Sequence, residues 1–319
     1  MTLVRILKDW DWPDLLRQTP GFKGEWDGIQ FTLDPAEECD YLIMLNNRMK
    51  EDFTVKCPPK NIWALMQEPY LRGHNDWMVE RHEKFYKVFT HHLPSKDPKY
   101  VVSHPAIPWH VNKTFDQLSS SKVPEKLKTI SWIVGDATDL PGHIKRLSFL
   151  RFLQGEDTLD IDLFGRAVQY IDDKWDGLAP YRYSLAIENS SSNDYWTEKL
   201  ADCFLAWSIP FYYGCTNLED YFPEESFIRI DINDPVKSVE KIKVVIEEDE
   251  WEKRLAALEE ARNLALYEYQ LFPHLTKLIR KHYVPFEIKR RITISAYKRS
   301  VSAALYRILY KIRKQLRMF

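Results

Sequence analysis

Polar side chains gather where an apolar run in the middle of the chain ends. The run Tyr183–Ile187 has the length and composition of a buried strand, and it stops at Glu188 and Asn189. A serine-rich loop follows, and Asp194–Lys199 then leads into a helical pattern. We expect these polar groups to meet at the carboxyl end of the strand, where open α/β sheets bind their ligands. The start of the helix would add free N–H groups and a partial positive charge, which suit a phosphate group.

Each polar residue of this segment could bind part of a ligand that carries phosphate and sugar. Lys199 would place a full positive charge opposite a phosphate, and Glu198 would accept hydrogen bonds from sugar hydroxyls. Tyr195 would contact the ligand beside Glu198, while Glu188 and Asn189 would line the sugar pocket. Purely structural roles stay open, because a carboxylate is favoured near any helix N-terminus and an asparagine followed by serines is typical of a turn.

The segment Tyr181–Gly214 resembles the donor-binding motif of the family 10 glycosyltransferases, the α1,3/4-fucosyltransferases. That motif reads Y-x-F-x-L-x-F-E-N, a loop, D/G-Y-V-T-E-K, a helix, and then P-x-x-x-G. Two positions depart from it, since Ile187 replaces the usual aromatic residue and Trp196 the usual valine. The resemblance implies GDP-fucose as the donor substrate and transfer that requires neither a metal nor a cofactor. The matching residues are Tyr181, Tyr183, Leu185, Glu188, Asn189, Tyr195, Thr197, Glu198, Lys199, Pro210 and Gly214.

A diphosphate bound without a metal needs positive side chains, and the resemblance implies an arginine in addition to the lysine. In the family, an arginine stands a few residues into the helix after the first strand of the donor domain, and a phenylalanine follows three residues later. Arg146 and Phe149 match this pattern after the predicted strand Thr129–Val134. Lys145 and Arg151 are the competing cations on the same predicted helix.

A glutamate in the N-terminal half is the candidate general base. Gln67, Glu68 and Pro69 directly follow the predicted strand Ile62–Met66. The resemblance implies the role, because family members carry a Glu-Ser-Pro stretch here whose glutamate is the proposed base; this chain lacks the serine. Inverting transfer needs a carboxylate on the face opposite the leaving group, where it deprotonates the acceptor hydroxyl. A surface residue before a proline is the structural alternative. The weaker candidates for the base are Asp76, Asp9, Asp11 and Asp14.

Two further patterns could in principle carry chemistry. Asp160 and Asp162 have the D-x-D form of metal-dependent transferases, and alternation along a strand would put both carboxylates on one face. No other metal ligand accompanies them, so we predict no metal site. The chain has no G-x-G-x-x-G or P-loop pattern, which argues against classical dinucleotide binding and ATP hydrolysis. Four histidines near two prolines could line the acceptor site or be purely structural: His91, His92, His104 and His110.

Strand-like and helix-like patterns alternate through the chain, which predicts parallel sheets with covering helices. There are more strands than one small sheet holds, so we predict an α/β fold with two domains. The predicted strands are Tyr41–Leu45, Ile62–Met66, Lys87–Thr90, Thr129–Val134, Asp160–Phe164, Tyr183–Ile187, Ile209–Tyr213 and Phe227–Ile232. The predicted helices are Trp10–Gln18, Asp76–Lys84, Gly142–Leu153, Thr197–Trp207, Val236–Val245 and Glu250–Leu264.

A segment with neither a helical nor a strand-like period of apolar residues separates the two predicted domains. Lys113–Lys128 is rich in polar residues and is the predicted linker. We therefore predict an acceptor-binding domain at residues 1–118, a donor-binding domain at residues 119–284, and a basic tail at residues 285–319. The resemblance implies the GT-B arrangement, in which two Rossmann-like domains face a cleft.

The composition is that of a soluble globular protein. The 319 residues are 45% hydrophobic and 29% charged, enough to bury a core in each of two domains. No stretch of about 18 apolar residues occurs, so we expect no transmembrane helix. Acidic residues come too early at the N-terminus for a signal peptide, and the four cysteines lie far apart, which suggests reduced thiols in the cytoplasm.

The C-terminal tail carries a charge opposite to that of the body. Residues 285–319 contain ten Lys or Arg and one acid, a net charge of +9, whereas residues 1–284 carry −11. We expect residues 286–319 to hold the protein peripherally on the inner face of a bacterial membrane, because a basic amphipathic helix suits an anionic surface. Packing on the acidic body or in an oligomer is the alternative. The apolar residues, spaced by three or four, are Val301, Leu305, Ile308, Ile312, Leu316 and Phe319.

Together these patterns predict an inverting α1,3-fucosyltransferase that transfers fucose from GDP-fucose to a hydroxyl of a glycan containing GlcNAc or Glc. One alternative keeps the fold and uses another GDP-sugar or a UDP-sugar. A second alternative is a non-catalytic protein that binds glycans or nucleotides and is held at the membrane by its tail. We expect no nucleic-acid partner, because the body of the protein is acidic.

Overall fold

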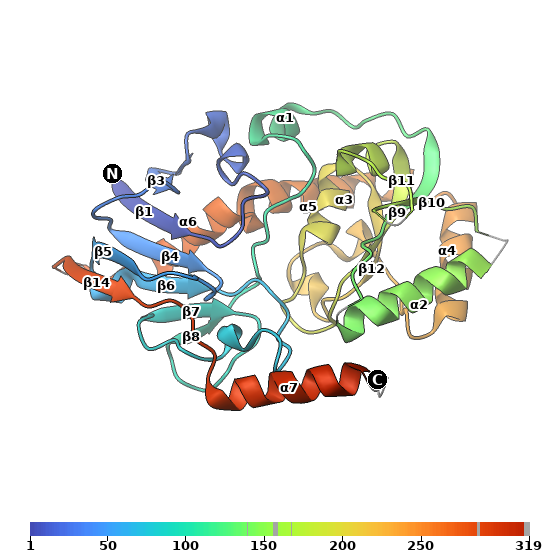
Figure 1. Cartoon of the computed structure of the whole chain (residues 1–319). Coiled ribbons are helices and arrows are strands. Elements are labelled where there is room, and N and C mark those ends of the chain that lie inside the picture. Colours follow the sequence, from blue (N-terminus) through green and yellow to red (C-terminus); the bar gives the residue numbers. More distant parts are fainter. Residues whose placement is uncertain (139, 156–158, 167, 286–287, 316–319) are drawn as a thin grey trace. The chain divides into compact units, whose positions relative to one another are not determined.

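The computed structural model describes all residues of the chain except 139, 156–158, 167, 286–287 and 316–319. The chain divides into two compact units (Figure 1). The first unit contains residues 1–106 together with 272–319, and the second contains residues 107–271. A mostly parallel sheet forms the centre of each unit.

The first unit is built on a seven-stranded sheet with the order β2-β3-β1-β4-β6-β7-β8. The short edge strand β2 is antiparallel to β3, and all other neighbours are parallel. The strands are β1 (Thr2–Leu7), β2 (Glu25–Trp26), β3 (Ile29–Thr32), β4 (Tyr41–Leu45), β6 (Ile62–Leu65), β7 (Lys87–Thr90) and β8 (Tyr100–Val102). β4 and β6 are buried along their whole length, as expected for central parallel strands covered on both faces.

The C-terminal part of the chain completes this first unit. Helix α6 (Leu271–Lys281) places Phe272 against Phe31 of β3, with ring centroids 5.1 Å apart. Strand β14 (Arg290–Ile294) pairs antiparallel with β5 (Phe53–Cys57) in a separate two-stranded ribbon. The last described element is helix α7 (Val301–Gln315).

The second unit is a five-stranded parallel sheet with the order β10-β9-β11-β12-β13. Helix α3 packs against β11 and β12, and α2 contacts α4. The strands are β9 (Lys128–Ile133), β10 (Asp162–Phe164), β11 (Tyr181–Ile187), β12 (Ile209–Tyr213) and β13 (Ile228–Arg229). The helices are α1 (Phe115–Ser120), α2 (Pro141–Gly155), α3 (Glu198–Leu205), α4 (Pro235–Glu247) and α5 (Leu255–Leu264). The chain adds β10 on one side of β9 and then β11, β12 and β13 on the other side, so the strand order reverses at β9.

Local capping explains where the helices of the second unit begin. Thr197 caps α3 by accepting a hydrogen bond from the backbone N–H of Lys199. Asp234 caps α4 in the same way and is followed by Pro235, whose fixed φ suits the first helical position. The inner face of α3 is apolar, and this face lies on the sheet.

The structure confirms the predicted α/β fold with parallel sheets, and several predicted elements have the expected positions. Lys87–Thr90 and Ile209–Tyr213 are strands with the predicted bounds. Two predicted helices are wrong. Trp10–Gln18 and Asp76–Lys84 form only single 3₁₀ turns, at Leu16–Gln18 and Asp76–Met78.

Side-chain hydrogen bonds explain why the helix predicted to start at Asp76 does not continue. The Asp76 carboxylate accepts from the backbone N–H of Gly73, and the His82 ring bonds to the backbone oxygen of Trp77. Polar side chains that bond to nearby backbone in this way compete with a helical hydrogen-bond ladder. The patterns also missed the strands β1, β2, β3, β5, β8 and β14.

The compact units have boundaries other than those predicted from the sequence. They divide after residues 106 and 271, whereas the predicted domains end at residues 118 and 284. Helix α6 belongs with the first unit because its core residues pack there, and His274 bonds the hydroxyl of Ser103 at 2.8 Å. The predicted linker Lys113–Lys128 contains α1, which opens with a capping box between Thr114 and Gln117.

Among the described residues, no helix is both long enough and apolar enough to cross a membrane.

Candidate functional site

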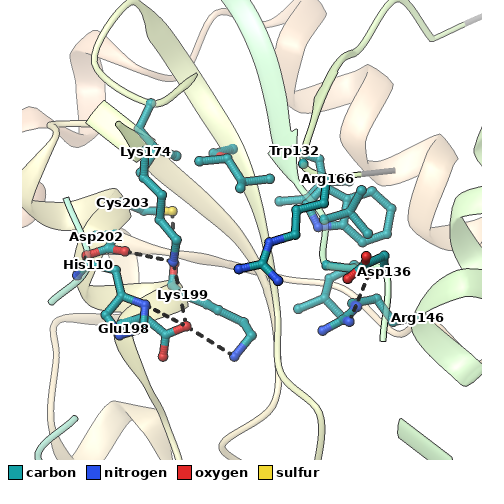
Figure 2. A pocket seen from close by; sticks show the side chains of 18 residues that line it. His110, Trp132, Asp136, Arg146, Arg166, Lys174, Glu198, Lys199, Asp202 and Cys203 are labelled. Atoms are coloured by element: carbon teal, nitrogen blue, oxygen red, sulfur yellow. Dashed lines mark hydrogen bonds and ion pairs between the residues drawn. The ribbon is translucent and has the colours of Figure 1, made fainter. Parts of the chain in front are cut away.

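A cavity of about 330 Å³ opens at the carboxyl ends of β9 and β11 in the second unit (Figure 2). Its lining includes Trp132–Asp136, which end β9, and Leu185 and Ile187 of β11. These two strands flank the point where the strand order of the sheet reverses. Ligands of open α/β sheets bind at such switch points, because the loops on either side diverge and leave a crevice. The volume is within the usual range for small-molecule sites.

The carboxylate of Glu188 joins the end of β11 to the start of α3. Its side chain is fully buried, and its Oε1 accepts from the backbone N–H of Thr197 at 2.7 Å. Its Oε2 accepts from Nζ of Lys199 at 3.3 Å. Burial raises the pKa of Glu188, and the ammonium of Lys199 opposes that shift. Glu188 is not among the residues that line the cavity; it holds in place a lysine that is.

Lys199 lies between two carboxylates. Its Nζ is 3.5 Å from Oε1 of Glu198 and also bonds Oγ1 of Thr197 at 3.2 Å. Burial would lower the pKa of Lys199, but the negative charges of Glu198 and Glu188 outweigh burial and raise it. The side chain therefore keeps its positive charge at the start of α3, where the helix dipole is also positive.

Glu198 is an ionised carboxylate on the wall of the cavity. Its Oε1 lies 3.6 Å from Nζ of Lys174 and 3.8 Å from Nδ1 of His110. Burial would raise the pKa of Glu198, but Lys199, His110 and Lys174 together hold it well below the usual range. An ionised carboxylate of this kind can accept hydrogen bonds from ligand hydroxyls.

Asp202, one turn after Glu198 on α3, extends the network, and sequence reasoning missed it. Its Oδ1 accepts from the backbone N–H of His110 at 2.8 Å, and its Oδ2 accepts from Nζ of Lys174 at 3.1 Å. Burial would lower the pKa of Lys174, but Asp202 and Glu198 outweigh it and raise that pKa. The spacing of four residues between Glu198 and Asp202 was a usable signal, because such residues share a helix face. Lys174 lies in a 3₁₀ turn and had no comparable signal.

Arg146 approaches the cavity from the opposite wall, on α2. Its guanidinium donates to Oδ1 of Asn189 at 2.6 Å and to the backbone oxygen of Gly135 at 3.2 Å. Only 5% of the residue is exposed, and burial lowers its pKa. Its Nε has no hydrogen-bond partner among the described residues. The two competing cations of this helix, Lys145 and Arg151, are exposed and do not line the cavity.

A second arginine on this wall was not predicted. Arg166 stands two residues after the end of β10, and its guanidinium reaches toward the middle of the cavity (Figure 2). No hydrogen bond or ion pair joins it to another residue in the described part of the chain. The signal was present in the sequence, since Arg166 stands just after the carboxyl end of an apolar run.

The predicted site residues fall into three groups. Arg146, Glu198 and Lys199 line the cavity, whereas Glu188 and Asn189 bond to two of these residues without lining it. A third group lies apart. Tyr195 is buried before the start of α3, and Glu68 is an exposed residue of the first unit, at the bend after β6.

In the D-x-D pattern, Asp162 is hydrogen-bonded to other side chains of the second unit. Oδ2 of Asp162 accepts hydrogen bonds from Nζ of Lys128 at 2.7 Å and from the hydroxyl of Tyr181 at 2.6 Å. The described residues include no group of three or more His, Cys, Asp or Glu side chains that could hold a metal ion. Independence from metal stays a prediction.

The second unit matches a known family. Residues 123–254 match the family model for the C-terminal domain of glycosyltransferase family 10 (fucosyltransferase). A stretch of 132 residues is 33% identical to 4-galactosyl-N-acetylglucosaminide 3-alpha-L-fucosyltransferase 9 of Mus musculus and of Homo sapiens. This stretch is 39% of the chain and 35% of each relative, so the chain matches about a third of their length. A putative fucosyltransferase-like protein of Arabidopsis thaliana is 35% identical over 100 residues, 30% of this chain and 19% of that protein.

The fold agrees with a solved enzyme over nearly the whole chain. The crystal structure of an alpha1,3-fucosyltransferase with GDP-fucose aligns with a TM-score of 0.51 and 14% identity, covering 91% of this chain and 92% of that one. At this identity the likeness concerns the fold, which is of the GT-B class with two Rossmann-like domains. The match to glycosyltransferase family 10 thus lies in the second unit and covers residues 123–254.

Gly142 in the first turn of α2 allows the close approach that seats Arg146. A Cβ atom at this position would overlap the backbone oxygen of Asn189. We expect Gly142→Ala to lower the free energy of unfolding by about 1–3 kcal/mol, because overpacking would push α2 away from the end of β11. Gly155 of the same helix is the matched control, since a Cβ there meets open space and Gly155→Ala should be neutral or stabilising. Urea denaturation of both variants measures the difference, and equal stabilities would contradict this role.

Proposed function

We propose that the protein is an inverting α1,3-fucosyltransferase that transfers fucose from GDP-fucose to a hydroxyl of a glycan acceptor containing GlcNAc or Glc. The observation that carries the proposal is the pair Glu198–Lys199 at the start of α3, which lines the cavity at the switch point of the sheet. The match of residues 123–254 to glycosyltransferase family 10 supports the same donor chemistry. An ionised carboxylate beside a protonated lysine suits a ligand that carries both hydroxyls and phosphates.

The proposed donor site supplies positive charge from side chains. Arg146 and Lys199 would hold the diphosphate as negative charge builds on the leaving group, and the N-terminus of α3 would add its dipole. Arg166 is a third cation for the same purpose. Glu198 would accept hydrogen bonds from donor hydroxyls. Since these cations already occupy the cavity, the proposal needs no metal.

The proposed base comes from the first unit. Glu68 would take the proton of the acceptor hydroxyl as that oxygen bonds to the anomeric carbon of fucose, while the bond from this carbon to GDP breaks on the opposite face. The backbone before Glu68 is well held, which suits a positioned base. Gln67 donates its N–H to Oδ1 of Asn46 at 2.9 Å, and its side-chain amide donates to the backbone oxygen of Pro105 at 3.1 Å.

A thermal-shift comparison of GDP, UDP, GDP-fucose and GDP-mannose tests the donor assignment, because binding stabilises the folded state by mass action. We expect GDP-fucose and GDP to stabilise the wild-type protein most. Arg146→Ala and Lys199→Ala should each weaken GDP binding about 10- to 100-fold, since each removes a charged hydrogen-bond donor. Arg151→Ala is the control, an exposed cation of the same helix as Arg146. A preference for UDP, or undiminished GDP binding in both variants, would sink the assignment.

A second experiment separates binding from chemistry. Glu68→Gln should bind GDP-fucose like the wild type but transfer fucose at least about 100-fold more slowly, in line with the usual contribution of a general base. Glu51→Gln, also an exposed glutamate of the first unit, should keep the wild-type rate. Initial rates with radiolabelled donor and a soluble N-acetyllactosamine acceptor provide the measurement, and repeating them in EDTA tests independence from metal. A near-wild-type rate for Glu68→Gln would place the base elsewhere.

We propose that α7 attaches the protein peripherally to the inner face of a bacterial membrane. Its apolar residues are uncovered, with Val301 89%, Leu305 56% and Ile308 55% exposed. Arg307 and Lys311 stand on the same helix. Apolar residues that insert among acyl chains and cations that meet anionic headgroups together support surface binding, to which each cation contributes about 1 kcal/mol.

Deleting residues 308–319 tests this attachment and keeps the first half of α7. We expect the shortened protein to lose most of its binding to vesicles of phosphatidylglycerol and phosphatidylcholine, measured by sedimentation. Binding of the full chain should fall as salt rises, because the lipid charge is screened. Transfer to a soluble acceptor should persist. If the full chain ignores anionic vesicles at low salt, the membrane assignment is wrong.

A further inference from the structure

The segment that leads into α7 is bonded to the loop that follows Glu68. Nε of Arg299 donates to Oδ2 of Asp76 at 3.1 Å, and its NH2 donates to the backbone oxygen of His74 at 2.8 Å. The Asp76 side chain is only 4% exposed, and its other oxygen accepts from the backbone N–H of Gly73 at 2.8 Å. Arg299 therefore compensates a buried carboxylate that shapes the loop. Removing the partner of such a group is costly, because the charge is left uncompensated.

The first turns of α7 contact the same loop. The guanidinium of Arg72 lies 3.4 Å from the ring centroid of Tyr306, a cation–π contact. The backbone of Gly73 approaches α7 so closely that a Cβ there would be 3.0 Å from backbone atoms of Tyr306 and Arg307. Gly73 also has a φ of +82°, which favours glycine. The loop and the helix are thus fitted to each other at backbone distance.

A third contact lies at the far end of the loop. Oε1 of Glu80 accepts from the hydroxyl of Tyr297 at 2.6 Å and from the backbone N–H of Ser300 at 3.0 Å. The three contacts span the loop from Arg72 to Glu80, on both sides of the single 3₁₀ turn within it.

The loop has little regular structure of its own to keep its shape. Apart from the Asp76–Met78 turn, no helix or strand lies between β6 and β7 in the described chain. Its beginning is held by Asn75, whose Oδ1 accepts from the N–H of Leu71 at 2.6 Å and whose Nδ2 donates to the oxygen of Pro69. Asn75 and Asp76 are adjacent in the chain. Asn75 holds the residues next to Glu68 through its hydrogen bonds to Leu71 and Pro69, and Asp76 links the same segment to the tail through Arg299.

We propose that residues 297–307 are a positioning element of the acceptor side of the site: they brace the loop that follows Glu68. The inference rests on the proposed function of Glu68. It divides the tail into a proximal part, which holds the loop through Tyr297, Arg299 and Tyr306, and a distal part. In the distal part, Ile308, Leu309 and Ile312 are exposed. Binding of the distal part to a membrane would then affect how well the loop beside Glu68 is held in place.

Hydrogen exchange and steady-state kinetics of the full-length Arg299→Ala variant test the brace. We expect amides of residues 71–80 to exchange at least about 10-fold faster, as a locally opened segment does, while strands β4 and β6 keep their protection. With a soluble acceptor, kcat/KM should fall about 10-fold or more and KM for the acceptor should rise, because a small misplacement near the reacting groups is costly. Binding of GDP, which concerns the second unit, should stay within about twofold of the wild type.

Two further variants sharpen the test. Arg299→Lys keeps a cation opposite Asp76 and should restore part of the lost activity, which a nonspecific loss of stability would not explain. Lys298→Ala removes the neighbouring exposed cation and should exchange and react like the wild type. If Arg299→Ala does not fold, Tyr306→Ala replaces it, since that side chain is 39% exposed and its loss breaks the contact with Arg72.

Unchanged exchange of residues 71–80 in Arg299→Ala and Tyr306→Ala would overturn the brace. Faster exchange with unchanged acceptor kinetics would also overturn it, because the loop would then be held without consequence for the reaction. Failure of the proposed function looks different: the wild-type protein itself would not transfer fucose, whatever the exchange of the loop.

Discussion

The candidate site depends on one buried carboxylate. Glu188 brings a negative charge to the end of β11, where its side chain is fully buried, and burial of an unpaired charge would cost several kcal/mol. The cost is offset by Thr197 and Lys199, which both belong to the start of α3. Strand end and helix start are therefore held at hydrogen-bond distance. Gly214 permits this geometry, because a Cβ at that position would overlap the Glu188 side chain.

Acidic and basic side chains alternate from Glu188, which does not itself line the cavity, along one cavity wall through Lys199, Glu198 and Lys174 to Asp202. Each lysine lies between two carboxylates, and for that reason both lysines have a raised pKa in spite of burial. Glu198 lies between two lysines and has a lowered pKa for the converse reason. The wall therefore carries two lysine cations and the Glu198 anion, each held in place by its ion-pair partners. It presents fixed charges to a ligand without having to reorganise, which is the condition for effective electrostatic stabilisation.

The opposite wall supplies a surplus of positive charge. Arg146 is anchored by Asn189, the residue that follows Glu188, so both walls are tied to the same strand end. Arg166 has an exposed guanidinium directed into the cavity. In the first unit, Glu68 lies three residues after the end of β6, and the C-terminal segment is bonded to the loop that follows it. Arg299 lies more than 220 residues away in the chain from its partner Asp76.

The sequence by itself determined the local features of this protein. Apolar runs bounded by polar residues located β7 and β12 to the residue. The segment Tyr181–Gly214 pointed to family 10, which residues 123–254 match, because its residues lie close together in the chain. Local patterns predict a site when its strand, loop and helix residues follow one another in the chain. The resemblance implied Arg146 on the helix after the first strand of the donor domain, and its side chain lines the cavity; its role in donor binding stays a prediction.

Only the tertiary structure decided which of these features meet. The sheet order that makes β9 and β11 neighbours, with the cavity at their ends, depends on pairing between strands about fifty residues apart, which no local period records. Lys174 is held in the site by its hydrogen bond to Asp202. Asp76 bonds to Gly73 and Arg299 and does not start the predicted helix. In each case a buried charge took its partner from a distant segment. The energy of satisfying that charge exceeded the weak local preference, and for this reason the sequence pattern could not anticipate the contact.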